Sequence, residues 1–215
     1  GRIWMSNWET YFLLAEGALR GWTTSISAKD AYENGVRASF DFMGVGEYAT
    51  QYLASTNYNR VGTSVSFDHT EEPVSFEADY VDGYTKEAGK TTYNYPDPSK
   101  ILYKGGKLND QLTKIITQKY IANTPYGALE IWNDRRRLGL PFFEIAGNEG
   151  ALTGSDMEPY YTTEDWKSGQ KWSHYSQRMR YPTGLENSDP VEYKNALQLL
   201  GGDNNMMVPL WWAIH

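Results

Sequence analysis

The sequence contains no cysteine in its 215 residues. Disulfide bonds, thiolate catalysis and cysteine-based zinc sites are therefore excluded, and no residue of the segment can carry a thioether-linked lipid. Its three histidines, His69, His174 and His215, lie far apart without metal-ligand spacing, so metal binding through imidazole is not predicted. No apolar run approaches the ~20 residues that a membrane-spanning helix needs, and no signal peptide is recognisable.

Positive charge is also scarce, because 20 Lys and Arg stand against 27 Asp and Glu, a net charge of −7. Nucleic-acid binding requires a basic patch, and the dense basic run at residues 135–137 is typical of an ion-paired or solvated helix face. The sequence has no G-x-S-x-G, H-E-x-x-H or phosphate-binding glycine loop. A glycosidase needs two opposed carboxylates, and no acidic residue stands in a recognisable motif. The sequence therefore predicts no enzyme, no cofactor and no nucleic-acid partner.

Aromatic residues are what the chain has in excess: 8 Trp, 17 Tyr and 7 Phe make up 15% of it. Tyr and Trp combine a flat apolar face with a polar edge, which suits both core packing and stacking on the apolar face of a sugar ring. Packing is expected to take most of these rings. Trp4, Trp8, Tyr11 and Trp132 stand at helix-packing positions, and the two tryptophans at residues 211–212 are expected to seal the C-terminal segment onto the helices.

The N-terminal segment predicts a pair of helices. Ser6 and Glu9 form the S-x-x-E pattern of a capping box, in which Ser6 caps the helix and Glu9 reaches back to it. Apolar residues then recur at helical spacing as far as Leu19. A second helix begins after Ser27, and small residues on it allow close approach to its neighbour: Ala31, Gly35 and Ser39. A short third helix is expected at about residues 46–54.

Downstream, helical periodicity resumes at Leu108, and a partner helix is expected at about residues 128–138, with an acidic start and a basic end that suit the helix dipole. A last short helix is expected at residues 191–200. The intervening residues 55–106 are rich in Thr, Ser, Gly, Tyr and Asp. We expect a long excursion there with one or two short strands, and partial alternation is visible at residues 61–67.

The expected organisation therefore has four parts. A helix-pair block at residues 1–54 is followed by a loop-rich insertion at 55–106, a second helix pair at 107–140 and an irregular C-terminal region with a short helix at 141–215. Helix pairs separated by insertions predict a mainly α, helical-repeat fold with long irregular loops and a few short strands. About three repeats are needed to bury a continuous core, which indicates that these residues belong to a larger domain.

Several stretches resemble, in the right order, the C-terminal half of the SusD/RagB family of nutrient-binding outer-membrane lipoproteins. They are residues 2–22 (RIWMSNWETYFLLAEGALRGW), 31–39 (AYENGVRAS), 115–122 (IITQKYIA), 132–136 (WNDRR) and 178–182 (RMRYP), with the closing pairs and triplet at 195–196, 201–202 and 210–212. Each stretch alone is weak. Because they follow one another over nearly the whole chain, together they form a specific match.

This resemblance implies tetratricopeptide-like helix pairs that carry an irregular, loop-rich region. Family members are typically more than twice this length, so the N-terminal half, with its signal peptide and lipidated cysteine, is expected upstream. The resemblance also implies a cell-surface protein of Bacteroidetes type, anchored to the outer membrane through that N-terminal lipid. Such a protein binds glycan or another nutrient, caps a SusC-like TonB-dependent transporter and delivers the oligosaccharide to it.

Glycan binding by such a protein requires aromatic platforms held on loops, with nearby groups that hydrogen-bond to hydroxyls. Asp79, Asp82, Asn94 and Asp165 could serve the hydroxyls. The aromatic candidates come from the two loop-rich regions, and those singled out are Tyr80, Tyr84, Tyr160, Tyr161, Trp166 and Trp172. The alternative is that these rings pin the loops to the helices.

Other interpretations stay open. The acids Glu77, Asp79, Asp82 and Glu87 could form a calcium loop, but the D-x-D-x-D-G spacing is missing, so a solvated loop is favoured. The chain could instead be a helical-repeat scaffold that binds only protein, or an accessory module of a glycoside hydrolase. Oligosaccharide binding with quenching of aromatic fluorescence would favour the carrier, and release of reducing ends would favour a hydrolase.

Overall fold

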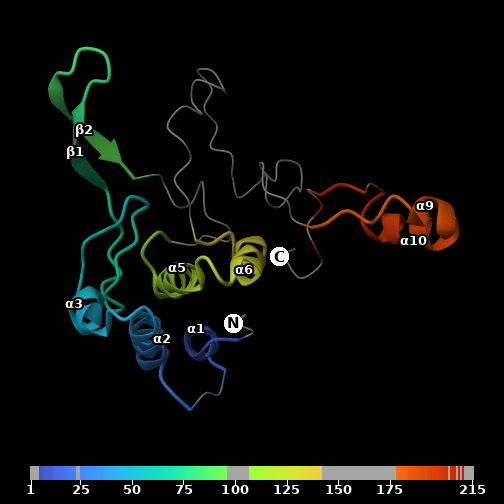
Figure 1. Ribbon diagram of the computed structural model, residues 1–215, viewed down its shortest axis with the longest axis horizontal. Coiled ribbons are helices and arrows are strands. Elements are labelled where there is room, and N and C mark those ends of the chain that lie inside the picture. The colour runs from blue at the N-terminus through green and yellow to red at the C-terminus, as the bar shows by residue number, and fades with distance from the viewer. Residues whose placement is uncertain are drawn as a thin grey trace.

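The computed structural model describes residues 5–22, 25–95, 107–141, 178–202, 204–206, 208 and 210. In these residues the chain is mainly helical, and its strands form one two-stranded sheet, as the predicted mainly α class requires. None of the helices in these ranges is long and apolar enough to cross a bilayer. Figure 1 shows a group of packed helices, a β-hairpin that rises from one side of it, and a short C-terminal helical segment that stands apart.

An antiparallel pair of helices, α1 (Asn7–Leu19) and α2 (Ala28–Phe42), opens the fold. The hydroxyls of Ser6 and Ser27 cap the two helices, each accepting the backbone N–H three residues further on, at 3.2 and 3.0 Å. These caps satisfy N–H groups that a helix otherwise leaves without a partner. The sequence prediction of the caps is therefore confirmed at both helices.

Close approach of α1 and α2 depends on a small residue, as the sequence predicted. A Cβ atom at Gly35 would lie 3.0 Å from the ring of Phe12, which is tighter than ordinary van der Waals contact. Phe12 is almost completely buried, so its ring has little room to withdraw. Glycine at this position thus sets the distance between the two helices.

The second half of the predicted capping box is wrong. Glu9 does not reach back to the start of α1, because its buried carboxylate accepts hydrogen bonds from the ammonium of Lys119, at 2.9 Å, and from the side-chain amide of Asn123. Buried ionic partners on another helix outweigh a local cap, since an unpaired buried carboxylate would be costly. Glu9 therefore joins two helices instead of capping one.

The chain continues from α2 through η1 (Gly46–Tyr48) and α3 (Ala49–Leu53), which occupy the place of the third predicted helix. The second helix pair consists of α5 (Gln111–Asn123) and α6 (Ala128–Leu138). Gly139, with φ 70°, ends α6 in the left-handed conformation that favours glycine. Helix α6 therefore has the bounds that the sequence predicted, residues 128–138.

Helix α5 begins slightly later than the periodicity suggested. Asp110 is its N-cap, and its carboxylate accepts the N–H of Thr113 at 2.8 Å. Leu108 lies before the helix yet is buried in the core, so its place in the apolar pattern reflects packing and not helical backbone. An apolar residue just outside a helix extends the apparent periodicity in this way.

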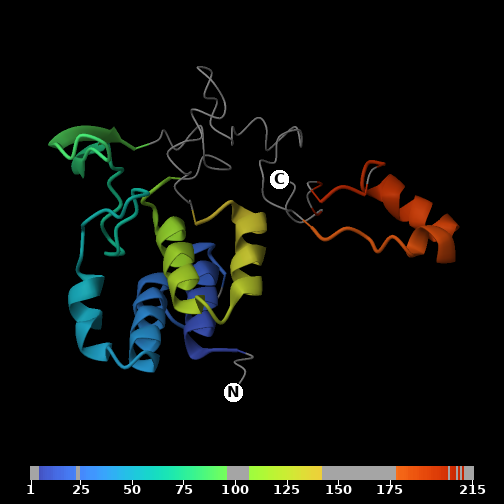
Figure 2. The same cartoon turned by 45° about the horizontal axis from the view of Figure 1, so that its top comes forward.

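The core lies where α1, α2 and α5 meet, and Figure 2 shows these helices side by side with α6 at the flank of α5. Aromatic and aliphatic side chains from all three helices fill it, together with side chains from the connecting segments. The buried apolar residues of this cluster are Trp8, Phe12, Ala15, Ala31, Tyr32, Val36, Leu53, Phe67, Leu108, Ile115, Ile116, Ala122 and Leu140.

Residues 61–67 are not a strand, although their sequence alternates. Thr63 donates its hydroxyl hydrogen to the Leu108 carbonyl at 2.6 Å, and the Ser64 N–H donates to the Asn109 side chain at 2.7 Å. Their polar groups are thus satisfied by the residues that precede α5, so no neighbouring strand is needed. The connection that carries the hairpin is thereby fastened to the helical core.

The strands lie further along, at β1 (Ser75–Val81) and β2 (Ala88–Asn94), which pair antiparallel. They flank a turn that begins with Asp82 and Gly83, a dipeptide typical of hairpins. Both strands fall inside the excursion that the sequence predicted to contain one or two of them. None of the residues in either strand is buried, so the hairpin projects from the core.

The C-terminal described segment holds α9 (Leu185–Ser188) and α10 (Pro190–Leu199). Pro190 occupies the first turn of α10, where its missing N–H costs nothing, and the Asp189 carboxylate accepts the N–H of Glu192 at 3.3 Å. The helix predicted at residues 191–200 is therefore present. Figure 1 places α9 and α10 away from the other helices.

Candidate functional site

The β-hairpin has two chemically different faces. Side chains alternate between the faces of a strand, and the register pairs Phe76 with Tyr93 and Tyr80 with Gly89. The rings of Phe76, Tyr80 and Tyr93 therefore lie on the same face of the hairpin, which we call the aromatic face. Its six residues are Phe76, Ala78, Tyr80, Gly89, Thr91 and Tyr93.

Tyr80 lies across the neighbouring strand at the outer end of the aromatic face. A Cβ atom at Gly89 would be 2.7 Å from Cζ of Tyr80 and 2.8 Å from its hydroxyl oxygen, so the ring occupies the space of a missing side chain. Aromatic rings commonly cover a strand glycine in this way. Tyr80 is nevertheless 49% exposed, so part of its surface can contact solvent or a ligand.

The inner end of the aromatic face merges with a cluster of rings. Phe76 and Tyr93 have centroids 5.1 Å apart, and Tyr95 lies 5.5 Å from each of them. Tyr58 extends the cluster, 6.2 Å from Tyr95 and 5.3 Å from His69. These are ordinary distances for stabilising ring pairs.

Hydrogen bonds fasten this cluster to the connection that precedes the hairpin. The Tyr95 hydroxyl donates to the Asn59 carbonyl at 3.2 Å, and the Tyr58 hydroxyl donates to the Glu71 carbonyl at 3.0 Å. Partial burial raises the pKa of both phenols, with smaller contributions from Glu71 and Glu72 at Tyr58 and from neighbouring tyrosines at Tyr95. Both hydroxyls therefore remain protonated donors at neutral pH, and the base of the hairpin is held in place.

The opposite face of the hairpin is charged. Lys90 lies 4.0 Å from a carboxylate oxygen of Glu77 and 3.8 Å from one of Asp79, and all three side chains are largely exposed. Asp82 accepts the N–H groups of Thr85 and Tyr84 in the turn, and these bonds hold its carboxyl pKa below the usual value. In the described part of the chain, no cluster of acids or histidines is suited to hold a metal.

The predicted site residues divide into two groups. Tyr80 lies on the aromatic face, and Tyr84 lies in the turn at its tip, where it is 96% exposed. The other four lie outside the described residues, and they are Tyr160, Tyr161, Trp166 and Trp172. Sequence reasoning did not single out Phe76, although period-two alternation on both sides of an Asp-Gly turn would have placed it beside Tyr80.

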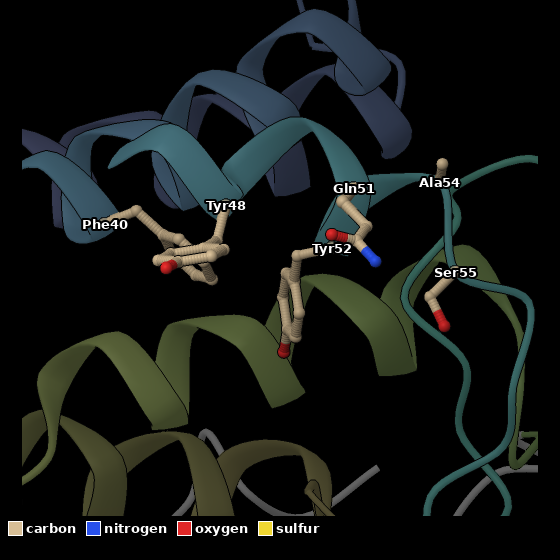
Figure 3. A pocket seen from close by; sticks show the side chains of 6 residues that line it. All are labelled: Phe40, Tyr48, Gln51, Tyr52, Ala54 and Ser55. Atoms are coloured by element: carbon tan, nitrogen blue, oxygen red, sulfur yellow. The ribbon is translucent and has the colours of Figure 1, made fainter. Parts of the chain in front are cut away.

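A separate hollow of about 490 Å³ lies along α2 and α3 (Figure 3). Tyr52 packs against Phe40 with a centroid distance of 4.9 Å and donates its hydroxyl hydrogen to Gln118 at 3.1 Å. Figure 3 shows the Tyr52 side chain directed toward α5. This ring therefore serves helix packing. The lining residues are Phe40, Tyr48, Gln51, Tyr52, Ala54 and Ser55.

One buried cluster has the residue types of a nucleophilic site. Ser64 Oγ lies 2.7 Å from the Lys114 ammonium and 2.9 Å from Nδ1 of His69, and burial lowers the Lys114 pKa to about 8. However, Ser64 is 1% exposed and Lys114 is 0% exposed. A nucleophile must reach its substrate, so this cluster serves to fasten the connection onto α5.

Comparisons of this chain with known proteins point to one family. The sequence profile of the SusD-like family, described as Susd and RagB outer membrane lipoprotein, matches residues 1–213. A solved SusD homologue from Parabacteroides distasonis is 34% identical and superposes with a TM-score of 0.63, over 95% of this chain and 32% of its own. A search of curated proteins gave no match.

Two further solved structures are similar at lower identity. A chitin-binding SusD homologue from Flavobacterium johnsoniae and a SusD-like protein from Bacteroides thetaiotaomicron are each 28% identical, with TM-scores of 0.57 and 0.56. Each match covers 97% of this chain and 36% of the other, so the chain spans about a third of the length of these relatives. Because the family profile matches nearly every residue, this chain belongs to the SusD/RagB family of outer-membrane lipoproteins.

Proposed function

We propose that this chain is part of a cell-surface protein that binds glycan and delivers it to a SusC-like TonB-dependent transporter. The observation that carries the proposal is the aromatic face of the hairpin, which exposes Tyr80 beside Phe76 and Tyr93 on a chain of the SusD/RagB family. Sugar rings have an apolar face that stacks on aromatic rings, and their hydroxyls need polar neighbours. The protein binds and transfers its ligand without breaking bonds in it.

A similar protein supports the choice of glycan over other nutrients. The homologue from Flavobacterium johnsoniae is described as chitin-binding, and it is 28% identical to this chain. Tyr84, Tyr160, Tyr161, Trp166 and Trp172 belong to the same proposal as further contacts of the glycan. The sequence predicts that the regions containing them are rich in loops, from which ligand-binding residues are commonly drawn.

The proposal includes a larger assembly around this chain. The four parts at residues 1–54, 55–106, 107–140 and 141–215 form one domain together with an N-terminal half, and that half carries the lipid anchor in the outer membrane. The chain spans about a third of its solved relatives, which leaves room for such a half. The transporter is the partner that receives the glycan.

The test is a binding panel on the full-length protein. Soluble oligosaccharides are titrated by calorimetry against the natural protein and against Tyr80→Ala, and reducing ends are assayed after prolonged incubation. At least one oligosaccharide should bind, the variant should bind it at least about tenfold more weakly, and no reducing ends should appear. Binding that is unaffected by Tyr80→Ala would remove the hairpin from the site, and released reducing ends would show catalysis.

A protein-binding scaffold is the second candidate, and an exposed apolar patch favours it. Phe42 and Tyr126 are more than half exposed with centroids 6.2 Å apart, and Phe42 lies 4.8 Å from Trp8. Exposed aromatic patches often mark protein contacts. Two results together would support this candidate over the first. The protein would bind no oligosaccharide of the panel, and a SusC-like transporter would copurify with the natural protein but not with Phe42→Ser.

A further inference from the structure

We propose that the aromatic face of the hairpin is a two-platform site for an extended, uncharged oligosaccharide, and that Gly89 positions the outer platform. This inference rests on the proposed function and adds the class of ligand and the residue that shapes the site. The outer platform is the Tyr80 ring, and the inner one is the pair Phe76 and Tyr93.

The distance between the platforms sets the length of the ligand. Phe76 and Tyr80 are four residues apart on β1, which corresponds to about 13 Å along a strand. Ala78 and its partner Thr91 lie between them, and both are small. A single sugar ring is shorter than this separation, so only a chain of several sugars reaches both platforms. The small pair leaves space for substituents, and Thr91 contributes a hydroxyl-bearing side chain to this face.

Gly89 determines how the outer platform lies. Any side chain at this position would meet Tyr80, since even a Cβ atom would come within 2.7 Å of the ring. The atoms concerned are at the far end of a flexible side chain, so a methyl group would displace the ring without breaking the strand pairing. Glycine therefore lets the ring lie against β2, in a fixed orientation that a ligand can use.

The charges of the hairpin select against anionic ligands. None of the six residues on the aromatic face is charged. The carboxylates of the two strands are on the opposite face, where Lys90 is close to two of them. The other lysine of the hairpin, Lys86, lies in the turn and donates to the Gly83 carbonyl at 2.7 Å. Recognition of a carboxylate or sulfate group requires cationic or N–H donors, and this face presents none from its side chains. The ligand class is therefore neutral.

The test uses the full-length protein and three ligand series of one to six sugars: chitin oligosaccharides, cello-oligosaccharides and oligogalacturonates. Affinities are measured by calorimetry. For at least one neutral series, affinity should rise with length until the chain spans both platforms and then level off, and the anionic series should bind at least about tenfold more weakly. A flat length dependence, or preference for the anionic series, would overturn the inference.

Two glycine variants isolate the positioning role. Gly89→Ala should weaken binding of the long neutral oligosaccharide several-fold and leave the thermal midpoint unchanged. Gly83→Ala in the same hairpin is the control, because nothing lies within 4 Å of its added Cβ, and it should change neither quantity. Equal affinities of the two variants would refute the role of Gly89.

The outcomes also separate this inference from the proposed function. If Tyr80→Ala weakens binding but short and long oligosaccharides bind equally, the protein still binds glycan and the two-platform site is refuted. If no series binds at all, the proposed function fails and the inference fails with it. Tyr80→Phe, which keeps the ring, should retain the length dependence, and its loss in that variant would contradict stacking as the cause.

Discussion

The helical core and the hairpin use charged residues in opposite ways. In the core, Lys119 joins Glu9 of α1 and Asp134 of α6 at 2.9 and 2.8 Å, with its side chain only 5% exposed. On the hairpin, Lys90 also approaches two carboxylates, but at 4.0 and 3.8 Å and with its side chain 69% exposed. The same pattern of one lysine and two acids is thus structural in one region and solvated in the other.

The core arrangement extends into a network that ties three helices together. Arg137 of α6 contacts Glu16 of α1 and Asp134, and Arg20 also contacts Glu16. Burial alone would raise the Glu16 pKa, but the two arginines hold it below its usual value. Each charge therefore has partners that offset its desolvation. The hairpin lacks such a network and is free to expose rings, which makes it the better place for a ligand.

The largest effect is expected from Lys119→Met in the core. This change leaves the buried carboxylates of Glu9 and Asp134 without their shared cation, and breaking a buried pair typically costs about 3–5 kcal/mol. Chemical denaturation of the full-length protein, followed by circular dichroism, should show a loss of this size. Lys90→Met is the matched control on the hairpin and should cost less than about 0.5 kcal/mol. Equal losses in the two variants would abolish the contrast between the regions.

The next effect is a pH dependence at the contact between core and hairpin connection. Burial lowers the Lys114 pKa to about 8 from 10.5, so between these values the unfolded chain binds more protons than the folded one. Stability from this residue should therefore rise as the pH increases from about 8 to 10.5, by up to about 3 kcal/mol.

The measurement compares the unfolding free energy of the natural protein with that of Lys114→Met at a series of pH values. The subtraction removes groups common to both proteins, such as the buried Tyr32 phenol. The natural protein should gain relative to the variant across this window. A constant difference from pH 7 to 10 would show that Lys114 keeps an ordinary pKa in the folded state.

Much of the helical core could be predicted from the sequence, because its signals are local. Ser6 and Ser27 stand beside the N–H groups that they cap, and Gly139 stands where α6 ends. The role of Glu9 could not be predicted in this way, because its partner Lys119 is 110 residues away in sequence. A local pattern gives the cap but cannot show that a distant cation competes for the same carboxylate.

The hairpin and the connection that precedes it show the limit of sequence-based prediction more clearly. Residues 61–67 alternate as a strand should, yet their polar groups bond to Leu108 and Asn109 instead. Tyr80 was singled out for its aromatic ring in a loop-rich region. Alternation along β1 puts Phe76 on the same face, whereas Gly89 is brought opposite Tyr80 only by the register of the two strands. The residues that β2 contributes to the face depend on strand register, so they could not be assigned before the pairing was known.

A smaller effect on stability is expected from Gly35→Ala on α2. The added methyl group would meet the buried Phe12 ring at 3.0 Å, and overpacking of this kind costs about 1–3 kcal/mol. Alanine recovers up to about 1 kcal/mol of helix propensity, so a net loss of about 1 kcal/mol is expected in denaturant titrations. Gly83→Ala, with open space around its Cβ, should lie within about 0.5 kcal/mol of the natural protein. A stabilised Gly35→Ala would mean that α1 and α2 can separate freely.

The smallest effect on stability, and the clearest separation of folding from function, is expected from Tyr84→Ala at the hairpin tip. The side chain is 96% exposed, so its removal should change the unfolding free energy by less than about 0.5 kcal/mol. If Tyr84 extends the glycan site beyond Tyr80, the same variant should bind the long oligosaccharide several-fold more weakly and the disaccharide unchanged. Calorimetry with both ligands distinguishes the possibilities, because an equal loss for both would show that the disaccharide already contacts Tyr84. No loss for either would restrict glycan contact on the hairpin to its aromatic face.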